Sequence, residues 1–348
     1  MRWFCAIPPL AAACAAQAQP GAAPAAPEPE ASRAAFTSFA LYWENDGGLL
    51  AKPFHPSDKH YTNGLKADFG FQSRDIDRWA SALPSPLGAP EAGNDGFRAG
   101  AGFGITQLIF TPTDLEATEP IPDDQPYAGY LGVNLFLQRA DRWNLEQFEL
   151  DIGLVGEYSL AEATQKQVHA AIPDQIDPQG WDNQLSHELI INFNYRRRWR
   201  HDPLALGALG FQAIPQVGFD VGNMRISANA DLLARVGWNL PNDFGPARIA
   251  DLRDISGSWT GASDWGFYLY GRAGGQAIAR DIFLDGNTFA DSLSVTREPF
   301  VGELQAGLVA RWRMIELGYA VTWTSEQFEE QEDPHAFGAW TLSAHWAF

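Results

Sequence analysis

Apolar and polar residues alternate with a period of two along most of the chain from about residue 37 onward. Such alternation is typical of β-strands with one apolar and one polar face. Twelve segments show it: 37–46, 61–73, 98–111, 127–139, 143–158, 185–198, 207–222, 225–239, 265–280, 298–312, 314–325 and 336–348. Single-chain barrels of the bacterial outer membrane have an even number of strands. The pattern therefore predicts an all-β protein, a twelve-stranded antiparallel transmembrane β-barrel of the outer membrane.

The phase of the alternation predicts which side chains face lipid. In 143–158 the apolar set is expected to point outward and the polar set into the lumen. The outward set is Phe148, Leu150, Ile152, Leu154 and Tyr158, and the inward set is Gln147, Glu149, Asp151 and Glu157. The last segment places Trp340, Leu342, Ala344, Trp346 and Phe348 outward. A soluble sandwich would also alternate, but aromatic residues at the segment ends favour the membrane barrel.

Strand parity assigns each connection to one rim of the barrel. If both termini are periplasmic, the extracellular connections are 47–60, 112–126, 159–184, 223–224, 281–297 and 326–335. The connections 74–97 and 240–264 are then periplasmic and unusually long for such a barrel. Within 159–184, the residues from Ala161 to Ile172 are good helix formers, and Pro173 is expected to end that helix.

Charge and hydropathy narrow the choice of partners. The 348 residues carry 43 acidic and 24 basic side chains, an excess of 43 − 24 = 19 negative charges. This balance argues against nucleic acid as a partner and is compatible with divalent cations. After the first residues there is no run of ~18 apolar residues, so no transmembrane helix is expected.

The start of the chain resembles a secretory signal. Arg2 precedes an apolar run from Trp3 to Ala16, and Ala16-Gln17-Ala18 resembles a cleavage site. We expect a signal peptide over 1–18, a Pro/Ala-rich linker over 19–33 and the barrel over 34–348. Lipid attachment at Cys14 is an alternative. Both cysteines lie in the signal, so the mature barrel is expected to have no disulfide.

Polar residues gather where the first two predicted strands meet their loop. By strict phase Glu44, Asp46 and Thr62 point inward, whereas Asn45 points outward unless the strand twists or bulges. Hard oxygen ligands of this kind suit Ca²⁺ better than zinc. Asp46 is therefore a candidate calcium ligand, and a solvated residue at the strand end is the alternative.

A second candidate group lies in the connection 159–184, on the same predicted rim. Gln165 and His169 are spaced i, i+4 and should share one face of the helix. Histidine is the side chain best suited to general-base work near neutral pH. Glu188 is expected to face inward just below the rim, as part of a polar lumen wall or as a weaker candidate metal ligand. The chain has no Gly-x-Ser-x-Gly elbow and no Gly-rich phosphate loop.

Five short motifs in this order resemble the outer-membrane lipid A 3-O-deacylases, the LpxR-type family. They are Glu44-Asn45-Asp46, Tyr61-Thr62-Asn63-Gly64, Gln125-Pro126-Tyr127-Ala128-Gly129, Gln165-x-x-x-His169 and Gly180-Trp181-Asp182-Asn183-Gln184. The similarity runs from about residue 37 to the end of the chain.

The resemblance implies a twelve-stranded barrel and a Ca²⁺-dependent esterase that removes the 3′-linked acyloxyacyl chain of lipid A in the outer leaflet. It implies that His169 activates water and that Asn45, Asp46, Thr62 and Gln165 belong to the active site, which faces the extracellular side. Lipopolysaccharide and outer-membrane lipids are then the partners. Two features depart from the pattern: 112–126 contains no lysine, and only Asp174 or Gln175 follows His169 where some members carry a glutamate.

Two other functions stay open from the sequence. His60-Tyr61-Thr62-Asn63-Gly64 resembles the His-x-Ser-Asn-Gly of outer-membrane phospholipase A, with Thr62 in place of the nucleophilic serine. A non-enzymatic channel or adhesin would also tolerate the many inward polar residues. Covalent labelling of Thr62 would favour the first alternative, and a steady large conductance would favour the second.

Overall fold

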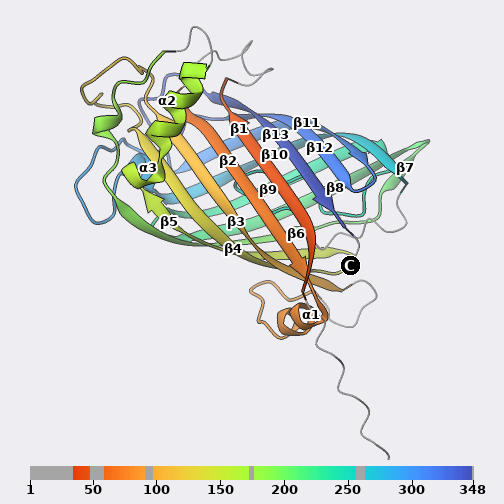
Figure 1. The fold of residues 1–348 in the computed structure, drawn as a ribbon. Helices are drawn as coiled ribbons and strands as arrows, with labels where there is room; N and C mark the ends of the chain where they lie inside the picture. Colours follow the sequence, from red (N-terminus) through yellow and green to blue (C-terminus); the bar gives the residue numbers. More distant parts are fainter. Residues whose placement is uncertain (1–33, 48–58, 91–96, 172–175, 256–262, 347–348) are drawn as a thin grey trace, which may run out of the picture.

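The strands of the protein form one antiparallel sheet that closes into a barrel. The computed structural model describes residues 34–47, 59–90, 97–171, 176–255 and 263–346. The strands are β1 (Ala35–Asn45), β2 (His60–Gln72), β3 (Arg98–Thr111), β4 (Ala128–Ala140), β5 (Asn144–Val155), β6 (Glu188–Trp199), β7 (Leu204–Leu206), β8 (Leu209–Gly222), β9 (Arg225–Trp238), β10 (Trp265–Asp281), β11 (Phe300–Trp312), β12 (Ile315–Thr324) and β13 (His335–His345). Figure 1 shows them wrapped around a common axis.

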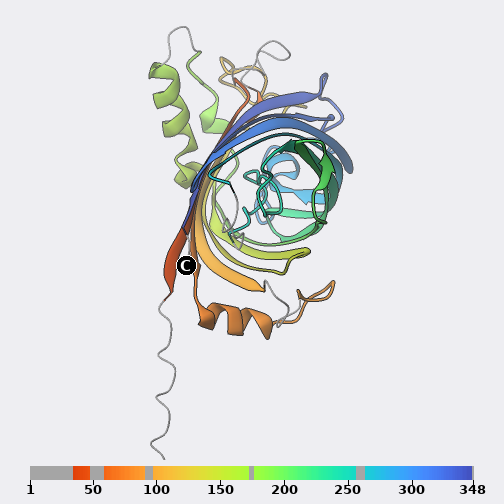
Figure 2. The same cartoon turned by 90° about the vertical axis from the view of Figure 1, so that its right-hand side faces the viewer.

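Two pairings close the sheet, one between the first and last strands and one that bypasses the short β7. β1 pairs with β13, and β6 pairs with β8, so hydrogen bonds run around the whole wall. β7 has only three residues and pairs only with β8. Twelve strands therefore make the wall in the described residues, which confirms the predicted strand number. Figure 2 looks along the barrel and shows the closed ring.

The fifth predicted segment is too long at its end. The predicted strand 143–158 stops as β5 at Val155, because Gly156 adopts a φ of 99° that turns the chain. A 3-10 turn follows, η1 (Glu157–Ser159). Glu157 and Tyr158 therefore do not continue the alternation, and their predicted inward and outward positions in the strand are wrong.

Other strand ends shift by a few residues. The predicted segment 185–198 starts as β6 only at Glu188, after the 3-10 turn η2 (Trp181–Asn183). The predicted segment 336–348 ends as β13 at His345. The predicted signal peptide, the linker and Phe348 lie outside the described residues.

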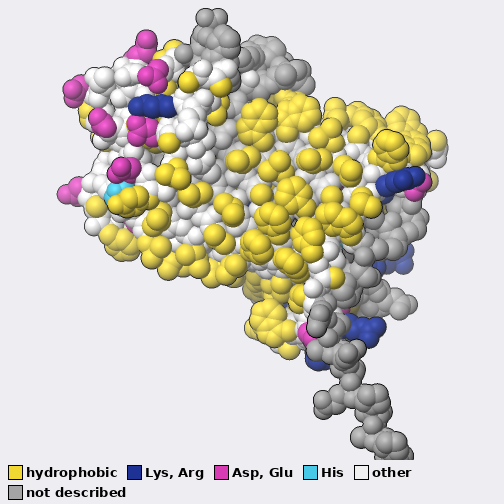
Figure 3. All heavy atoms as spheres, viewed as in Figure 1, with side chains coloured by type: hydrophobic (Ala, Val, Ile, Leu, Met, Phe, Trp, Pro, Cys, Tyr) yellow, Lys and Arg dark blue, Asp and Glu magenta, His cyan; other side chains and the backbone are white. Residues whose placement is uncertain are grey.

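Up to Val155, the phase predicted for β5 is confirmed. Ile152 and Leu154 are exposed on the outer face, whereas Glu149 and Asp151 of the same strand are buried toward the lumen. Figure 3 shows apolar side chains in a broad band over the barrel wall. Hydrocarbon can solvate such a band, and the closed ladder leaves no strand edge unpaired in lipid.

The two rims carry different structures. We call the rim with the connections β1–β2, β3–β4, β5–β6, β8–β9, β10–β11 and β12–β13 the α2 rim, and the opposite one the α1 rim. α1 (Arg74–Ser81) lies in the connection predicted over 74–97 and is capped by Ser73, whose Oγ accepts from the Ile76 N–H at 3.1 Å. Its Ala80 packs against Ala99 and Leu137. α2 (Ala161–Ala171) confirms the predicted helix, although Pro173 lies outside the described residues. No helix among the described residues has the length and hydrophobicity needed to cross a membrane.

The long connection 240–264 joins β9 to β10 on the α1 rim, the rim predicted to be periplasmic. Its described part enters the barrel from the α1 rim, and we call residues 243–255 the lumen plug. Ile249 packs against Ala40 and Tyr42, and Leu252 packs against Phe136 on the inner wall. The plug combines such apolar residues with charged ones, so it can fill a lumen that is both apolar and polar.

One carboxylate of the plug gathers four guanidinium groups. The oxygens of Asp251 lie 2.8 Å from Arg272, 3.1 Å from Arg248, 3.4 Å from Arg196 and 3.7 Å from Arg198. Burial opposes its charge, but these cations hold the pKa of Asp251 well below its usual range. Removing one member of such a buried network typically costs about 3–5 kcal/mol. The plug is therefore fixed to the wall rather than loosely inserted.

An apolar layer closes the lumen near the α2 rim. The short helix α3 (Ile282–Asp285) turns inward there, and its Ile282 and Phe283 pack with Phe110 and Tyr130 of the wall. The rings of Phe110 and Phe283 stack with their centroids 4.1 Å apart. The plug and this apolar layer thus occupy the lumen toward its two ends.

Candidate functional site

A β-bulge in β2 shapes the first half of the candidate site. The register of β2 on β3 shifts between Tyr61 and Asn63, so Tyr61 turns into the lumen and Thr62 does not. The Thr62 hydroxyl bonds to the Thr111 hydroxyl at 2.7 Å. Thr111 has the phase of Ile109, which packs beneath α2 on the outer side of the wall. The inward position predicted for Thr62 is therefore wrong, because strict alternation cannot register an inserted residue.

Thr62 also fixes the residues at the end of β1. Its carbonyl oxygen accepts from the Asn45 side-chain amide at 3.0 Å and from the Asp46 main-chain N–H at 3.3 Å. The Asp46 carboxylate accepts from the Lys59 main-chain N–H at 2.8 Å and is buried. Glu44 faces the lumen as predicted, where its oxygens accept from the Tyr61 hydroxyl at 2.8 Å and from a plug N–H at 3.0 Å. In this hairpin Glu44 and Tyr61 therefore face the lumen, whereas the side chain of the neighbouring Thr62 faces the outer side of the wall.

The second half of the candidate site is α2, which lies outside the barrel. Figures 1 and 2 both show it against the outer wall at the ends of β2, β3 and β4. Its first turn sits directly over Gly129, where any side chain would overlap Ser159 and Ala161. The Gln107 side chain donates to the Ser159 carbonyl at 2.8 Å and holds the turn down. This packing explains why the motif ending in Gly129 requires a glycine.

α2 turns Gln165 and His169 toward the protein. Both are buried although the helix is largely exposed, which confirms the predicted shared face. The Gln165 Oε1 atom accepts from the Trp181 indole N–H at 2.8 Å. An indole N–H can only donate, so the bonded atom of Gln165 is its oxygen. Its Nε2 is buried and has no hydrogen-bond partner among the described residues, so this amide donor is available.

His169 is held in one tautomer. Its Nδ1 lies 2.5 Å from the carbonyl oxygen of Ile176, and a carbonyl can only accept. In the neutral ring Nδ1 therefore carries the proton, and Nε2 carries the lone pair. This is the form that a general base needs.

The structure brings the two halves to the same rim and the same strand. Thr62 on β2 bonds to Thr111 at the end of β3, and α2 packs on β3 and β4 just beside that end. The acidic connection before β4 also borders this region, where Asp124 lies 4.0 Å from His60. Asn45, Asp46, Thr62, Gln165 and His169 thus all belong to the α2 rim.

Glu188 has a different set of partners. It faces inward at the start of β6, as predicted, and its oxygens accept from Thr288 N–H at 2.7 Å, Asn223 at 2.8 Å and Asn287 at 3.2 Å. These bonds tie two rim connections to the wall. The geometry gives Glu188 a role in fixing those loops, and its role as a candidate metal ligand stays a prediction.

The donor set near Thr62 fits a hard cation. It offers the Asp46 carboxylate and the Asn45 and Thr62 oxygens, and Asn45 uses its amide nitrogen, not its oxygen, toward Thr62. Oxygen donors without sulfur or imidazole suit Ca²⁺. The described residues contain no group of three or more His, Cys, Asp or Glu arranged for a metal. A cation here would therefore depend largely on neutral oxygen ligands and on a bound substrate.

Sequence reasoning missed several residues around this site. Trp181 was visible only as part of a short motif, and nothing in its spacing indicated that it fixes the Gln165 amide. Thr111 carried no signal, because its role depends on the bulge. The lumen plug did carry a signal in the sequence, because its long connection mixes charged and apolar residues.

Comparisons with known proteins agree with this architecture. The family model described as "Outer membrane protein LpxR" matches residues 5–346. The solved structure of LpxR from Salmonella typhimurium superposes with a TM-score of 0.71 at 15% identity, covering 89% of this chain and 100% of that one.

More distant solved barrels match less well. The β domain of the Bordetella autotransporter BrkA matches with a TM-score of 0.44 at 9% identity, over 92% of this chain and 100% of that one. The Pseudomonas putida toluene transporter TodX matches with a TM-score of 0.33 at 7% identity, over 91% and 89%. These two likenesses carry no functional argument. No curated protein matches the chain.

Proposed function

Because the chain belongs to the LpxR family of outer membrane proteins, we propose that it is a lipid A 3-O-deacylase of the outer membrane. The substrate is lipid A, and the ester hydrolysed is the one that carries the 3′-linked acyloxyacyl chain. The observation that carries the proposal is the placement of His169 and Gln165 on a helix packed against the outer wall. Lipid substrates reach a barrel from that side.

In the proposed mechanism His169 is the general base. The Ile176 carbonyl keeps the proton on Nδ1, so Nε2 draws a proton from a water that attacks the ester carbonyl carbon. The same nitrogen then returns the proton to the departing 3′ oxygen. No covalent enzyme intermediate forms.

The Gln165 amide stabilises the developing oxyanion. Trp181 holds the oxygen of that amide, so Nε2 is the end directed at other partners. Removing a donor of this kind typically lowers kcat about 10²- to 10³-fold. Asp46 would hold Ca²⁺ together with Asn45 and Thr62, which are hydrogen-bonded to one another and to the Asp46 main chain. When bound, Ca²⁺ supplies a positive charge that polarises the ester carbonyl.

The phospholipase A-like alternative has less support. It needs a base that activates the Thr62 hydroxyl, but that hydroxyl bonds to the Thr111 hydroxyl. His60 instead lies near Asp124 and packs edge-on against Phe328 and His335.

The decisive test is lipid A analysis by mass spectrometry from cells that express the wild type or His169→Ala. We expect the wild type to remove the acyloxyacyl group and the variant to lose about 10²- to 10⁴-fold in rate. The matched control is His187→Ala, which alters an exposed histidine on the same rim that stacks on Tyr158. Full deacylation by His169→Ala, or loss of phospholipid acyl chains instead, would overturn the proposal.

A further inference from the structure

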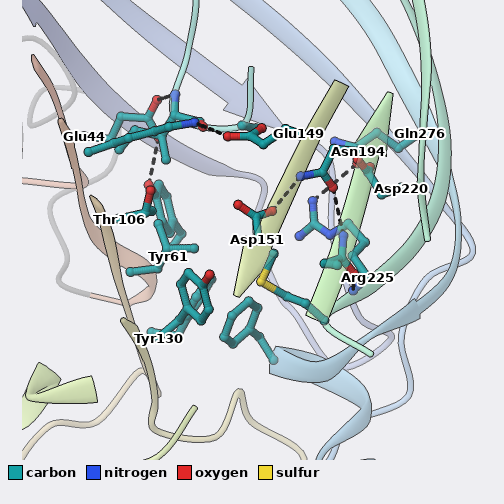
Figure 4. A pocket seen from close by; sticks show the side chains of 18 of the residues that line it. Glu44, Tyr61, Thr106, Tyr130, Glu149, Asp151, Asn194, Asp220, Arg225 and Gln276 are labelled. Carbon is teal, nitrogen blue, oxygen red and sulfur yellow. Dashed lines mark hydrogen bonds and ion pairs between the residues drawn. The ribbon is translucent and has the colours of Figure 1, made fainter. Parts of the chain in front are cut away.

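The lumen keeps a cavity between the plug and the apolar layer. Its volume is about 200 Å³, and it lies on the inner side of the wall, away from α2. Figure 4 shows Asp151 pointing into it between Tyr130 and Asn194. For comparison, a cavity of roughly 150 Å³ holds a benzene-sized molecule. The space therefore suits a small organic ligand.

The cations that line the cavity are already neutralised. The pairs are Lys66 with Glu149 at 2.8 Å, Arg196 with Asp220 at 2.8 Å and Arg225 with Asp281 at 2.5 Å. Glu303, which also lines the cavity, pairs with Arg248 of the plug. Among the described residues that line the cavity, no cation is left without an ion pair for an anionic ligand.

Two lining carboxylates, Glu44 and Asp151, form no ion pair with a described residue. Glu44 is satisfied by its two hydrogen bonds from Tyr61 and the plug. Asp151 receives only the Asn194 amide at 2.6 Å, through one of its two oxygens. It is 8% exposed. A buried carboxylate without a cation is costly, and a bound cation would offset that cost.

Part of the cavity lining is aromatic, and the rest is made of the paired charges above and of polar side chains. Tyr61, Phe110 and Tyr130 line the cavity, together with Phe283 and the Met224 side chain. Aromatic faces attract organic cations, and quaternary ammonium groups are the ligands most often held this way. A metal ion would instead need several ligands around one point, and the described residues contain no group of three or more His, Cys, Asp or Glu arranged in this way.

We propose that the lumen cavity is a binding site for a small organic monocation, held by Asp151 and the aromatic faces of Tyr61, Phe110 and Tyr130. The positive end meets the carboxylate, and the alkyl groups meet the rings. This site is separate from the ester-hydrolysing site, because the cavity faces the lumen and α2 lies outside. The proposal does not rest on the proposed function.

The test uses choline as the cation and 3,3-dimethyl-1-butanol as its neutral isostere. Binding is measured by titration calorimetry on the purified barrel in a maltoside detergent, which has no cationic headgroup. We expect saturable binding of choline and at least tenfold weaker binding of the neutral isostere. We expect Asp151→Asn to weaken choline binding at least tenfold and Tyr130→Leu to weaken it several-fold. The control Asp202→Asn, in an exposed pair with Arg142, should bind choline as the wild type does.

Folding of each variant is checked by its heat-dependent mobility on SDS gels. Absence of choline binding to the wild type would refute the proposal. So would equal binding by Asp151→Asn, equal binding of the neutral isostere, or binding of Ca²⁺ but not choline to the Asp151 site. Because the experiment measures binding, its result does not depend on whether the protein has deacylase activity.

Discussion

The indole of Trp181 determines which end of the Gln165 amide is available. Its N–H bonds to Oε1 at 2.8 Å, and the ring is buried between Tyr127 and the first turn of α2. Trp181→Phe keeps the packing but removes the donor. The Gln165 oxygen then has no donor, and an unsatisfied buried acceptor costs about 1–3 kcal/mol. Without the indole bond nothing fixes the orientation of the amide, so its oxygen and nitrogen can exchange places. We expect a roughly tenfold loss of deacylase rate with little change in KM, measured on purified lipid A. Trp143→Phe, an exposed indole on the α1 rim, is the control and should leave the rate unchanged.

The second residue-scale prediction concerns calcium. Asp46 supplies the one carboxylate among the proposed ligands, and its geometry is fixed by Lys59 N–H and Thr62. Chelation with EGTA should abolish deacylation, and added Ca²⁺ should restore it better than Mg²⁺, which demands a stricter octahedron. Asp46→Asn keeps the shape but removes the charge, so we expect it to need at least tenfold more Ca²⁺ for half-maximal activity. Activity of the wild type in EGTA would rule out this role.

How far sequence predicts single residues depends on whether their geometry is local. Gln165 and His169 share a buried face because helical spacing alone places them together. Thr62 was assigned to the wrong face, because a bulge depends on pairing with β3 and leaves no mark in alternation. The tautomer of His169 is fixed by a hydrogen bond to the carbonyl oxygen of Ile176. Ile176 lies beyond the helix, and no motif indicates this contact.

At the scale of elements, α2 acts only if it stays docked on the wall. Its first turn crosses Gly129 with no room for a side chain. Gly129→Val should push α2 outward while the barrel ladder remains intact. We expect deacylase activity to fall at least tenfold, with unchanged heat-dependent gel mobility. The control is Gly271→Val on β10, where the nearest atom to an added Cβ is 3.8 Å away. Equal activity of the two variants would show that docking of α2 does not matter.

The plug shows why sequence predicts some elements and not others. Strands of the wall repeat a period-two pattern that needs no knowledge of neighbours. Residues 243–255 have no such period, because each faces a different part of the lumen. Asp251 meets arginines from two wall strands that are far apart in sequence, and only the closed barrel brings them together. A long connection rich in paired charges and apolar residues was the available signal.

For the whole molecule, the filled lumen predicts that the protein is not a channel. The plug occupies the lumen from the α1 rim, and Phe110, Tyr130, Ile282 and Phe283 pack across it near the α2 rim. These two groups of side chains leave no wide pore, and the space between them is a cavity of about 200 Å³. We expect purified protein in planar bilayers to give no steady conductance comparable to that of an open porin. The plug is fixed by several buried ion pairs, so the applied voltage should not release it. Asp251→Asn weakens that anchorage, and we expect it to produce brief openings absent from the wild type. A large, stable pore in the wild type would mean that the plug leaves the lumen in the membrane. That result would support the channel function as an alternative to the esterase.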